Sequence, residues 1–218
     1  FALTSQQRTA TAQAQGFFTH EIIPVSIAQR KGDPIVVDTD EHPRASTTLE
    51  GLAKLKPVVT AEGTVTAGNA SGINDGAAAV LIASEQAIEE YQLKPRAKII
   101  ASTAVGIEPR IMGFAPAPAI KKLLKQANLT LEQIDVIELN EAFAAQALAV
   151  TRDLGLADDS TQVNPNGGAI AIGHPLGASG ARLVTTALNQ LEQTGGTYAL
   201  CSMCIGVGQG IAMIIQRV

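Results

Sequence analysis

The sequence has no tryptophan, and aromatic residues make up only 3% of its 218 residues, so we expect a core of aliphatic side chains. It has only two cysteines, Cys201 and Cys204. A zinc site would need a second pair or nearby histidines, and His20 and His42 lie far away in the sequence. A redox pair should open a helix, whereas this pair ends an apolar, strand-like run. We therefore expect neither a metal site nor disulfide exchange.

A basic surface and a long apolar run are also missing. The net charge is −4, and no more than two lysines or arginines adjoin one another, which argues against nucleic acid as a partner. No apolar run reaches the roughly 18 residues that cross a bilayer, and no signal-like segment opens the chain. We expect a cytosolic protein without a membrane partner. Because the first residue is Phe1, we also expect a fragment or processed piece of a longer protein.

The stretch from Val163 to Gly180 is rich in glycine and contains two prolines and one histidine. That density disfavours a regular helix or an interior strand and predicts a shaped loop. His174 precedes Pro175, which restricts its backbone to extended geometry. A helix over 178–193 follows, and a glycine-rich loop entering a helix offers N–H groups to an anion or oxyanion. The alternative is an ordinary turn that lines the core and contains a structural histidine.

The rest of the chain predicts an α/β fold. Apolar periodicity and turn residues predict the following elements: helices over 3–15 (capped by Thr4 or Ser5), 49–55, 84–91, 116–127 and 141–154; a hairpin of 21–28 with 34–39; a buried strand over 77–83; and strands over 97–104, 135–139, 197–203 and 210–216. Strands and helices alternate until two strands close the chain. This order predicts a mixed, mostly parallel sheet with helices on both faces and an antiparallel end.

Three candidate catalytic residues, Asn140, His174 and Cys204, fall at the ends of predicted strands or just before a helix. Ligands of such sheets bind at the carboxyl ends of the strands, so we expect the three to converge. A cysteine whose pKa is modestly lowered and a histidine can both exchange protons near neutral pH, and the N–H of Gly206 could bind an oxyanion. Ser71, in a loop of small residues over 64–76, is a further candidate contact. Each has a plain alternative as a helix cap, a small buried residue or a turn glycine.

Four blocks carry a resemblance to a known family. They are Gly68–Gly76, Asn140–Ala144, Asn166–Gly180 with its Gly-His-Pro-Leu-Gly-Ala-Ser-Gly, and Cys204–Gly210. Together, and in this order, they look like the signature blocks of the thiolase family, and the resemblance covers essentially the whole chain. Three further segments look most like the thiolases that cleave β-ketoadipyl-CoA in the degradation of aromatic compounds: Asp33–Pro43, Met112–Pro118 and Asn164–Asn166.

The resemblance implies a role for each candidate catalytic residue. His174 would activate a nucleophilic cysteine and, with a water held by Asn140, stabilise the thioester oxyanion. Cys204 would be the acid and base that moves the proton at the substrate α-carbon, and the Gly206 N–H would contribute to a second oxyanion hole. The reaction would be a ping-pong transfer of an acyl group to the cysteine and then to coenzyme A.

The same resemblance implies a substrate path. Ser71 and the region around Arg44 would line the route of coenzyme A, Met112 would lie beside the acyl group, and Ala70 and Phe143 belong to the same set of substrate-binding residues. Coenzyme A and acyl-CoA would be substrates, and no permanently bound cofactor is implied.

The sequence departs from the family in length. Thiolases are about twice as long, are built from two similar βαβαβαββ halves, and carry the nucleophilic cysteine in the first half. The chain would comprise the end of an inserted loop domain (1–57), the last strand and helix of the N-terminal domain (58–93) and the C-terminal domain (94–218). Neither cysteine has the sequence context of the nucleophile, so we expect the chain to be inactive without its N-terminal half. The complete protein would form homodimers or homotetramers.

Two other functions compete with this one. A non-catalytic acyl-CoA-binding or assembly module fits the absent nucleophile. A nucleotide-binding oxidoreductase is suggested by the glycines of 206–210, but the eight residues after Gly210 are too few for the helix and second strand that such a loop requires. The sequence does not distinguish cleavage from condensation.

Overall fold

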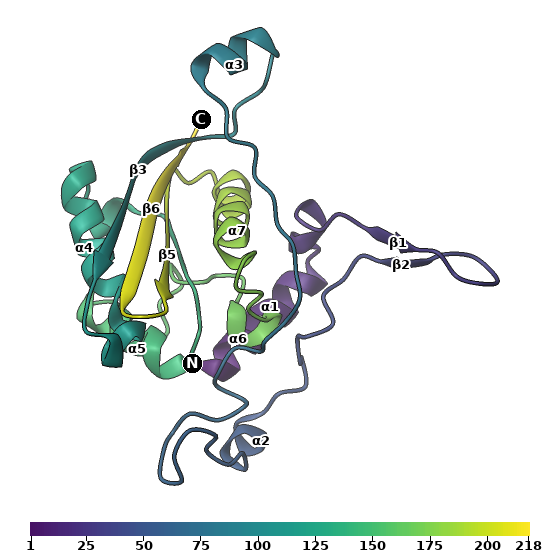
Figure 1. Cartoon of the computed structure of the whole chain (residues 1–218), viewed down its shortest axis with the longest axis vertical. Helices are drawn as coiled ribbons and strands as arrows, with labels where there is room; N and C mark the ends of the chain where they lie inside the picture. Colours follow the sequence, from purple (N-terminus) through teal and green to yellow (C-terminus); the bar gives the residue numbers. More distant parts are fainter.

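The protein is described by a computed structural model of residues 1–218, in which one four-stranded sheet organises most of the chain (Figure 1). The sheet has the order β3-β6-β5-β4. Its strands are β3 (Ala97–Gly106), β4 (Val136–Leu139), β5 (Tyr198–Ile205) and β6 (Gln209–Arg217). The four strands predicted between residues 97 and 216 are therefore present, with β3, β5 and β6 slightly longer than expected.

The sheet is mixed, as predicted, but its parallel share is smaller than expected. β4 and β5 pair in parallel, whereas β5 with β6 and β6 with β3 pair antiparallel. A three-residue turn joins β5 to β6 and forces these neighbours to run in opposite directions. The connection from β4 to β5 runs through several helices, as a parallel connection requires.

Helices cover both faces of the sheet, which confirms the predicted α/β architecture. α4 (Pro116–Ala127) and α5 (Ala144–Asp153) pack on one face, and α7 (Ser179–Thr194) packs on the other. Successive side chains of β4 point to opposite faces of the sheet. Ile137 and Leu139 pack in the core beneath α4, and Val136 packs in the core beneath α7. Both cores are built mainly of aliphatic side chains, as the scarcity of aromatic residues predicts.

The N-terminal segment begins with α1 (Ala2–Ala14), followed by the 3-10 helix η1 (Phe17–His20). The predicted Thr4 or Ser5 cap is wrong, because the helix starts earlier and Ser5 lies on its buried face. The hairpin of β1 (Val25–Ile27) and β2 (Ile35–Val37) forms as predicted and projects from the body (Figure 1). α2 (Leu49–Ala53) follows it.

The predicted buried strand over 77–83 does not form. The segment is extended but pairs with no strand, and Leu81 and Ile82 are 81% and 69% exposed. It is part of an unpaired thread of chain that leads to α3 (Glu85–Glu90) (Figure 1). An apolar run of this kind becomes a strand only beside another strand, and the chain offers none at this place.

Three smaller elements complete the structure. The predicted loop over 163–180 contains a one-turn helix, α6 (Ala169–Ile172), which the glycine content did not suggest. Two 3-10 helices, η2 (Pro109–Phe114) and η3 (Leu131–Gln133), fill connections. α5 begins at Ala144 rather than at residue 141, so Asn140 to Phe143 form the bend between β4 and α5. No helix combines the length and apolar character needed to cross a membrane.

Candidate active site

Asn140 and His174 meet beyond the carboxyl end of β4. The side-chain Nδ2 of Asn140 lies 3.2 Å from Nε2 of His174. Asn140 is fully buried directly after the last residue of β4, and its N–H donates to the Ser202 carbonyl of β5 at 2.9 Å. The sheet therefore fixes the backbone of Asn140, and the loop before α7 brings His174 to its side chain.

The other nitrogen of His174 is held by α7. Nδ1 lies 2.6 Å from Oγ of Ser179, the first residue of that helix. Burial, with a smaller contribution from the charge of Arg182, lowers the pKa of His174 below its usual value of 6.5. The imidazole is consequently neutral near pH 7 and able to accept a proton.

Asn140 has one unused polar atom. Its Oδ1 is buried and has no hydrogen-bond partner within the chain. A buried carbonyl oxygen without a partner is costly, so such atoms are usually bonded to water or to a ligand. The prediction that Asn140 holds a water beside His174 fits this atom.

Cys204 lies at the end of β5, two residues beyond Ser202, which pairs with Leu139 of β4. It is thus close to the same edge of the sheet as Asn140, although its thiol forms no hydrogen bond with Asn140 or His174. Burial raises the pKa of the Cys204 thiol. The expectation of a modestly lowered pKa is wrong, because desolvation of the thiolate outweighs the nearby polar groups. A protonated thiol is suited to donating a proton.

The turn after Cys204 presents an open backbone donor. The N–H of Gly206 donates no hydrogen bond within the chain, and a Cβ added at this position would meet no atom within 4 Å. Val207 and Gly208 complete the turn with φ values of 68° and 82°. The Gly206 N–H is therefore free to bind an oxyanion, as its predicted role requires.

The loop of small residues over 64–76 packs against the two segments that carry Asn140 and His174. Ala70 forms an antiparallel bridge with Phe143, and the Ser71 N–H donates to the Ala142 carbonyl at 3.0 Å. The His174 N–H donates to the Gly72 carbonyl at 3.1 Å. Three predicted substrate residues, Ala70, Ser71 and Phe143, are therefore neighbours of the Asn140–His174 pair.

Asn74 also positions the histidine loop. Its Oδ1 accepts from the His174 N–H at 3.4 Å, and its side chain occupies the place where a Cβ of Gly173 would stand. Gly173 has a φ of 90°, a conformation that other residues rarely adopt. Glycine is therefore required before His174 for two independent reasons.

Arg44 and Met112 lie at the margins of the site. The Arg44 N–H donates to Oε1 of Gln6, and its side chain is exposed. The neighbouring His42 packs against Gly72. Met112 precedes Gly113, which packs on the Gln146 side chain, and this side chain accepts from the Ala142 N–H at 3.1 Å. The structure thus places both segments beside the site, while the assigned contacts of Arg44 and Met112 with substrate stay predictions.

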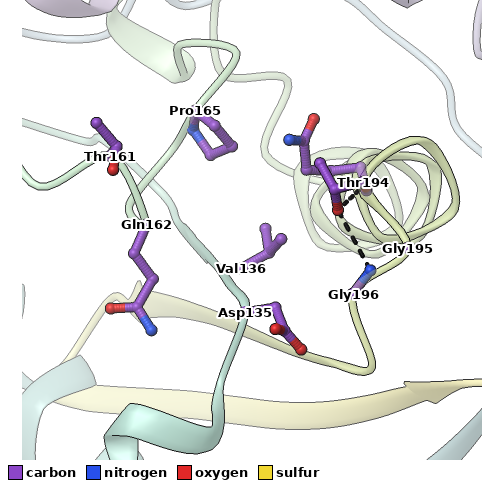
Figure 2. Close-up of a pocket in the computed structure, with 9 residues that line it drawn as sticks. Asp135, Val136, Thr161, Gln162, Pro165, Thr194, Gly195 and Gly196 are labelled. Atoms are coloured by element: carbon purple, nitrogen blue, oxygen red, sulfur yellow. Dashed lines mark hydrogen bonds between the residues drawn. The ribbon is translucent and has the colours of Figure 1, made fainter.

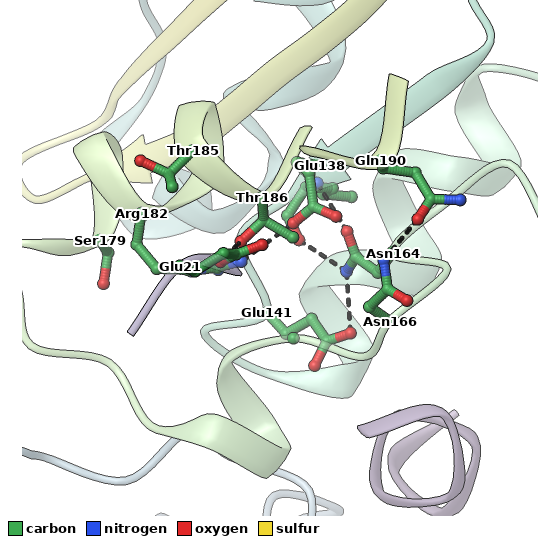
Figure 3. Close-up of polar contacts among 12 residues, drawn as sticks. Glu21, Glu138, Glu141, Asn164, Asn166, Ser179, Arg182, Thr185, Thr186 and Gln190 are labelled. Atoms are coloured by element: carbon green, nitrogen blue, oxygen red, sulfur yellow. Dashed lines mark hydrogen bonds and ion pairs between the residues drawn. The ribbon is translucent and has the colours of Figure 1, made fainter. Parts of the chain in front are cut away.

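Glu141 ties the segments of the site together (Figure 3). Its buried carboxylate accepts from Asn164 Nδ2 at 2.8 Å and from Ser5 Oγ at 2.6 Å. The Ile170 N–H donates to the same carboxylate at 3.2 Å. Burial raises the pKa of Glu141, and these hydrogen bonds oppose the rise. One side chain thereby connects the bend after β4 with α1 and α6.

A second buried acid lies on the α7 face of the sheet (Figure 3). Glu138 of β4 is fully buried and accepts from Arg182 at 2.9 Å, and its other oxygen has no partner. Glu21 lies nearby and accepts from Thr186 at 2.8 Å. Burial raises the pKa of Glu138 to about 8 although Arg182 opposes the rise, and burial also raises the pKa of Glu21. This cluster of ionisable groups lies outside the predicted set of site residues.

The raised pKa of Glu138 predicts a pH dependence of stability. The Glu138 carboxyl loses its proton near pH 4.5 in the unfolded state and near pH 8 in the folded state. The stability that this carboxyl contributes is therefore complete below pH 4.5 and is lost as the pH rises toward 8. Glu138→Gln should reduce this decline by at most about 1.4 kcal/mol per pH unit, the equivalent of one proton. Urea unfolding between pH 5 and 8 measures it.

Glu192 provides the matched control for this experiment. Arg96 lowers the pKa of Glu192, so its contribution is present above its unfolded pKa and is lost as the pH falls through its folded pKa. Glu192→Gln should therefore change the pH dependence only in the acidic range. An unchanged slope between pH 5 and 8 in Glu138→Gln would contradict the assignment.

A polar cleft of about 440 Å³ lies at the opposite end of the sheet (Figure 2). Asp135 and Val136 at the start of β4 line it together with Gly195 and Gly196 after α7. Since the Asn140–His174 pair lies at the carboxyl end of β4, this cleft belongs to a different part of the molecule.

The sequence matches the models of two domains of one known family. Residues 1–86 match "Thiolase, N-terminal domain", and residues 93–217 match "Thiolase, C-terminal domain". The chain belongs to the thiolase family. The three-part division at residues 57 and 93 stays a prediction.

Named thiolases are similar to the chain over its whole length. It is 84% identical to a β-ketoadipyl-CoA thiolase of Acinetobacter baylyi and 62% identical to one of Pseudomonas aeruginosa. Each alignment covers 100% of this chain and 54% of the relative, so the chain spans about half the length of these thiolases.

Solved thiolase structures share the fold. The chain is similar to an acetyl-CoA acetyltransferase of Bacillus anthracis with a TM-score of 0.94 at 42% identity, covering all of this chain and 54% of that one. It is also similar to human mitochondrial 3-ketoacyl-CoA thiolase in complex with CoA, with a TM-score of 0.89 at 45% identity and coverage of 100% and 53%. These similarities confirm the predicted thiolase-like fold.

The sequence did not point to several residues of the candidate site. Ser179 and Asn74 hold His174, and Glu141 joins α1 and α6 to the bend after β4, but none of the three was a candidate site residue. The spacing of Ser179, five residues after His174 at the start of a helix, was a usable signal. The contact of the buried Glu138 with Arg182 had no such signal, because it joins residues 44 positions apart.

Proposed function

We propose that the chain is the C-terminal part of a thiolase that cleaves β-ketoadipyl-CoA with coenzyme A, giving acetyl-CoA and a shortened acyl-CoA. The observation that carries the proposal is the contact of a neutral His174 with the buried Asn140, whose Oδ1 lacks a partner in the chain. The identity to named β-ketoadipyl-CoA thiolases supports the substrate.

In this mechanism the residues divide the work of a ping-pong reaction. His174 accepts the proton of a nucleophilic cysteine, which attacks the substrate carbonyl. Asn140, through a water on its Oδ1, and His174 stabilise the resulting oxyanion. Carbon–carbon cleavage leaves an enolate of acetyl-CoA, and Cys204 donates the proton that its α-carbon needs. The Gly206 N–H stabilises the enolate oxygen, and coenzyme A then removes the acyl group from the nucleophile.

The nucleophile is proposed to lie outside this chain. Cys201 is fully buried against the α7 core, where burial strongly raises its pKa. Cys204 also has a raised pKa. A nucleophilic cysteine needs the opposite shift, so both are unsuited to the role. The chain alone would bind coenzyme A or acyl-CoA at most, and turnover would need the N-terminal half, in a cytosolic homodimer or homotetramer.

Thiolysis of β-ketoadipyl-CoA tests the proposal directly. The chain preceded by the N-terminal part that its relatives carry, called the complete protein below, should release acetyl-CoA in the presence of coenzyme A. The chain alone should not. If the complete protein turned over acetoacetyl-CoA but not β-ketoadipyl-CoA, the proposed substrate would be wrong and the proposed thiolase reaction would stand.

The role of Cys204 predicts the loss of a partial reaction. In the complete protein, Cys204→Ala should slow exchange of the acetyl-CoA methyl protons with deuterium oxide by about 10²-fold or more, because Cys204 is the group proposed to move that proton. Proton NMR of acetyl-CoA measures the exchange. Cys201→Ala is the matched control, since Cys201 lies in the α7 core, and it should leave the exchange rate unchanged. Equal loss in both variants would contradict the assignment.

A further inference from the structure

Ser179 connects His174 to the start of α7. It is 2% exposed, and its Oγ lies 2.6 Å from His174 Nδ1 and 3.0 Å from the Pro175 carbonyl oxygen. The histidine, the proline and the serine thus form a closed hydrogen-bonded turn. The hydroxyl forms no other hydrogen bond in the chain.

The chemistry of the three groups fixes the direction of both hydrogen bonds. A carbonyl oxygen can only accept, so the Ser179 hydroxyl hydrogen is directed to the Pro175 carbonyl. The serine oxygen must then accept from His174, which places the imidazole hydrogen on Nδ1. Because the pKa of His174 is lowered and the ring is neutral, Nε2 carries a lone pair.

This tautomer also orients Asn140. A bare Nε2 is an acceptor, so it requires the amide hydrogens of Asn140 Nδ2 at 3.2 Å and would repel the amide oxygen. Oδ1 is therefore turned away from the imidazole, where it is left without a partner in the chain. The direction of one serine hydroxyl thus decides which atoms the histidine and the asparagine offer to the reacting groups.

We infer that Ser179 is a positioning residue of the thiolase reaction, which holds His174 in the Nδ1-protonated tautomer and thereby directs Nε2 and the Asn140 Oδ1 to their tasks. The inference rests on the proposed role of His174 as the base. When Nε2 takes a proton, the Nδ1–H bond to Ser179 becomes a bond from a cation to a hydroxyl, which is stronger than the neutral one. The contribution of Ser179 is consequently larger during the reaction than before it.

The tautomer is tested by nitrogen NMR of the complete protein labelled with ¹⁵N-histidine. The His174 signals are assigned by their absence from the spectrum of His174→Asn. We expect a protonated Nδ1 and an unprotonated Nε2 in the wild-type protein near pH 7.5, and loss of this single form in Ser179→Ala. A wild-type His174 protonated on Nε2 would overturn the inference, whether or not the enzyme turns over.

Steady-state kinetics test the consequence for catalysis. Ser179→Ala should lower kcat by about 10- to 100-fold, the range expected from the loss of one hydrogen bond to a charged group, with little change in KM. Ser179→Thr, which retains the hydroxyl, should recover most of the activity. Should Ser179→Ala fail to fold, Ser179→Cys takes its place, because a thiol is a much weaker acceptor of similar shape. A kcat within two-fold of wild type in the Ala or Cys variant would overturn the inference.

Thr185 is the matched control. Its hydroxyl donates to the Ala181 carbonyl at 3.0 Å, the same i to i−4 bond that Ser179 makes to Pro175, but it has no contact with a histidine. Thr185→Ala should leave kcat and the His174 tautomer unchanged, and an equal loss of kcat in Thr185→Ala and Ser179→Ala would overturn the inference. Absence of thiolysis in the wild-type protein would instead contradict the proposed function, and the NMR result would still decide the tautomer.

Discussion

His174→Ala in the complete protein should lower kcat/KM for thiolysis of β-ketoadipyl-CoA by about 10²- to 10⁴-fold, the usual contribution of a general acid–base group. The variant removes the only neutral base in contact with Asn140, and with it one of the two groups proposed to stabilise the thioester oxyanion. Acetyl-CoA release under saturating coenzyme A measures the loss.

A second histidine controls for effects unrelated to the site. His20 is exposed in η1, and His20→Ala should retain wild-type kcat/KM. The affinity of the His174→Ala protein for coenzyme A should change little, because the proposed coenzyme A path runs along Ser71 and Arg44. If His174→Ala kept more than a tenth of the activity, His174 would not be the base.

Glu141→Ala should destabilise the chain by about 3 kcal/mol or more. The change leaves the buried donors of Ser5, Asn164 and Ile170 without an acceptor and opens a cavity between α1, α6 and the end of β4. Urea unfolding at pH 7 measures the loss, and we expect the α1 contacts with residues 163–170 to weaken first.

Glutamine should not restore stability at this position. The Asn164 side chain accepts a hydrogen bond from the N–H of Leu139 and donates one to the Leu139 carbonyl. Its amide therefore cannot rotate to accept a hydrogen bond from a glutamine. The amide of Glu141→Gln would place its NH₂ group against Asn164 Nδ2 in one orientation and against the Ile170 N–H in the other. Glu62→Ala, in an exposed loop, is the control and should change stability by no more than about 0.5 kcal/mol. A Glu141→Gln protein as stable as wild type would contradict this view of the carboxylate.

The helices and paired strands were predictable because their patterns are local. α4 and α7 follow the 3.6-residue period, and β5 and β6 are joined by a short glycine-rich turn that specifies an antiparallel pair. The segment over 77–83 has an equally clear apolar pattern, but a strand also needs a partner. The local patterns therefore predicted a strand correctly where a neighbouring strand is present in the chain to pair with it.

The site was predictable in its residue types more than in its electrostatics. The rule that ligands bind at the carboxyl ends of strands predicted the meeting of Asn140 and His174. The pKa of Cys204 was predicted in the wrong direction, because it depends on how deeply the thiol is buried. Ser179 and Glu141 were missed as supporting residues, since their roles depend on side-chain directions that a single sequence does not contain.

The contacts that build the site also bear on the order in which the protein folds. Three hydrogen bonds join residues that are far apart in the sequence. They connect Ser5 with Glu141 (136 residues apart), Arg8 with the Val163 carbonyl (155 residues apart) and the His174 N–H with Asn74 (100 residues apart). Closing such long loops costs chain entropy before the contacts can repay it, and proteins rich in them fold slowly. The sheet hairpin of β5 and β6 can form early from neighbouring residues. The geometry around His174 is then among the last features to appear, so a folding intermediate with native-like secondary structure would still lack an assembled catalytic site.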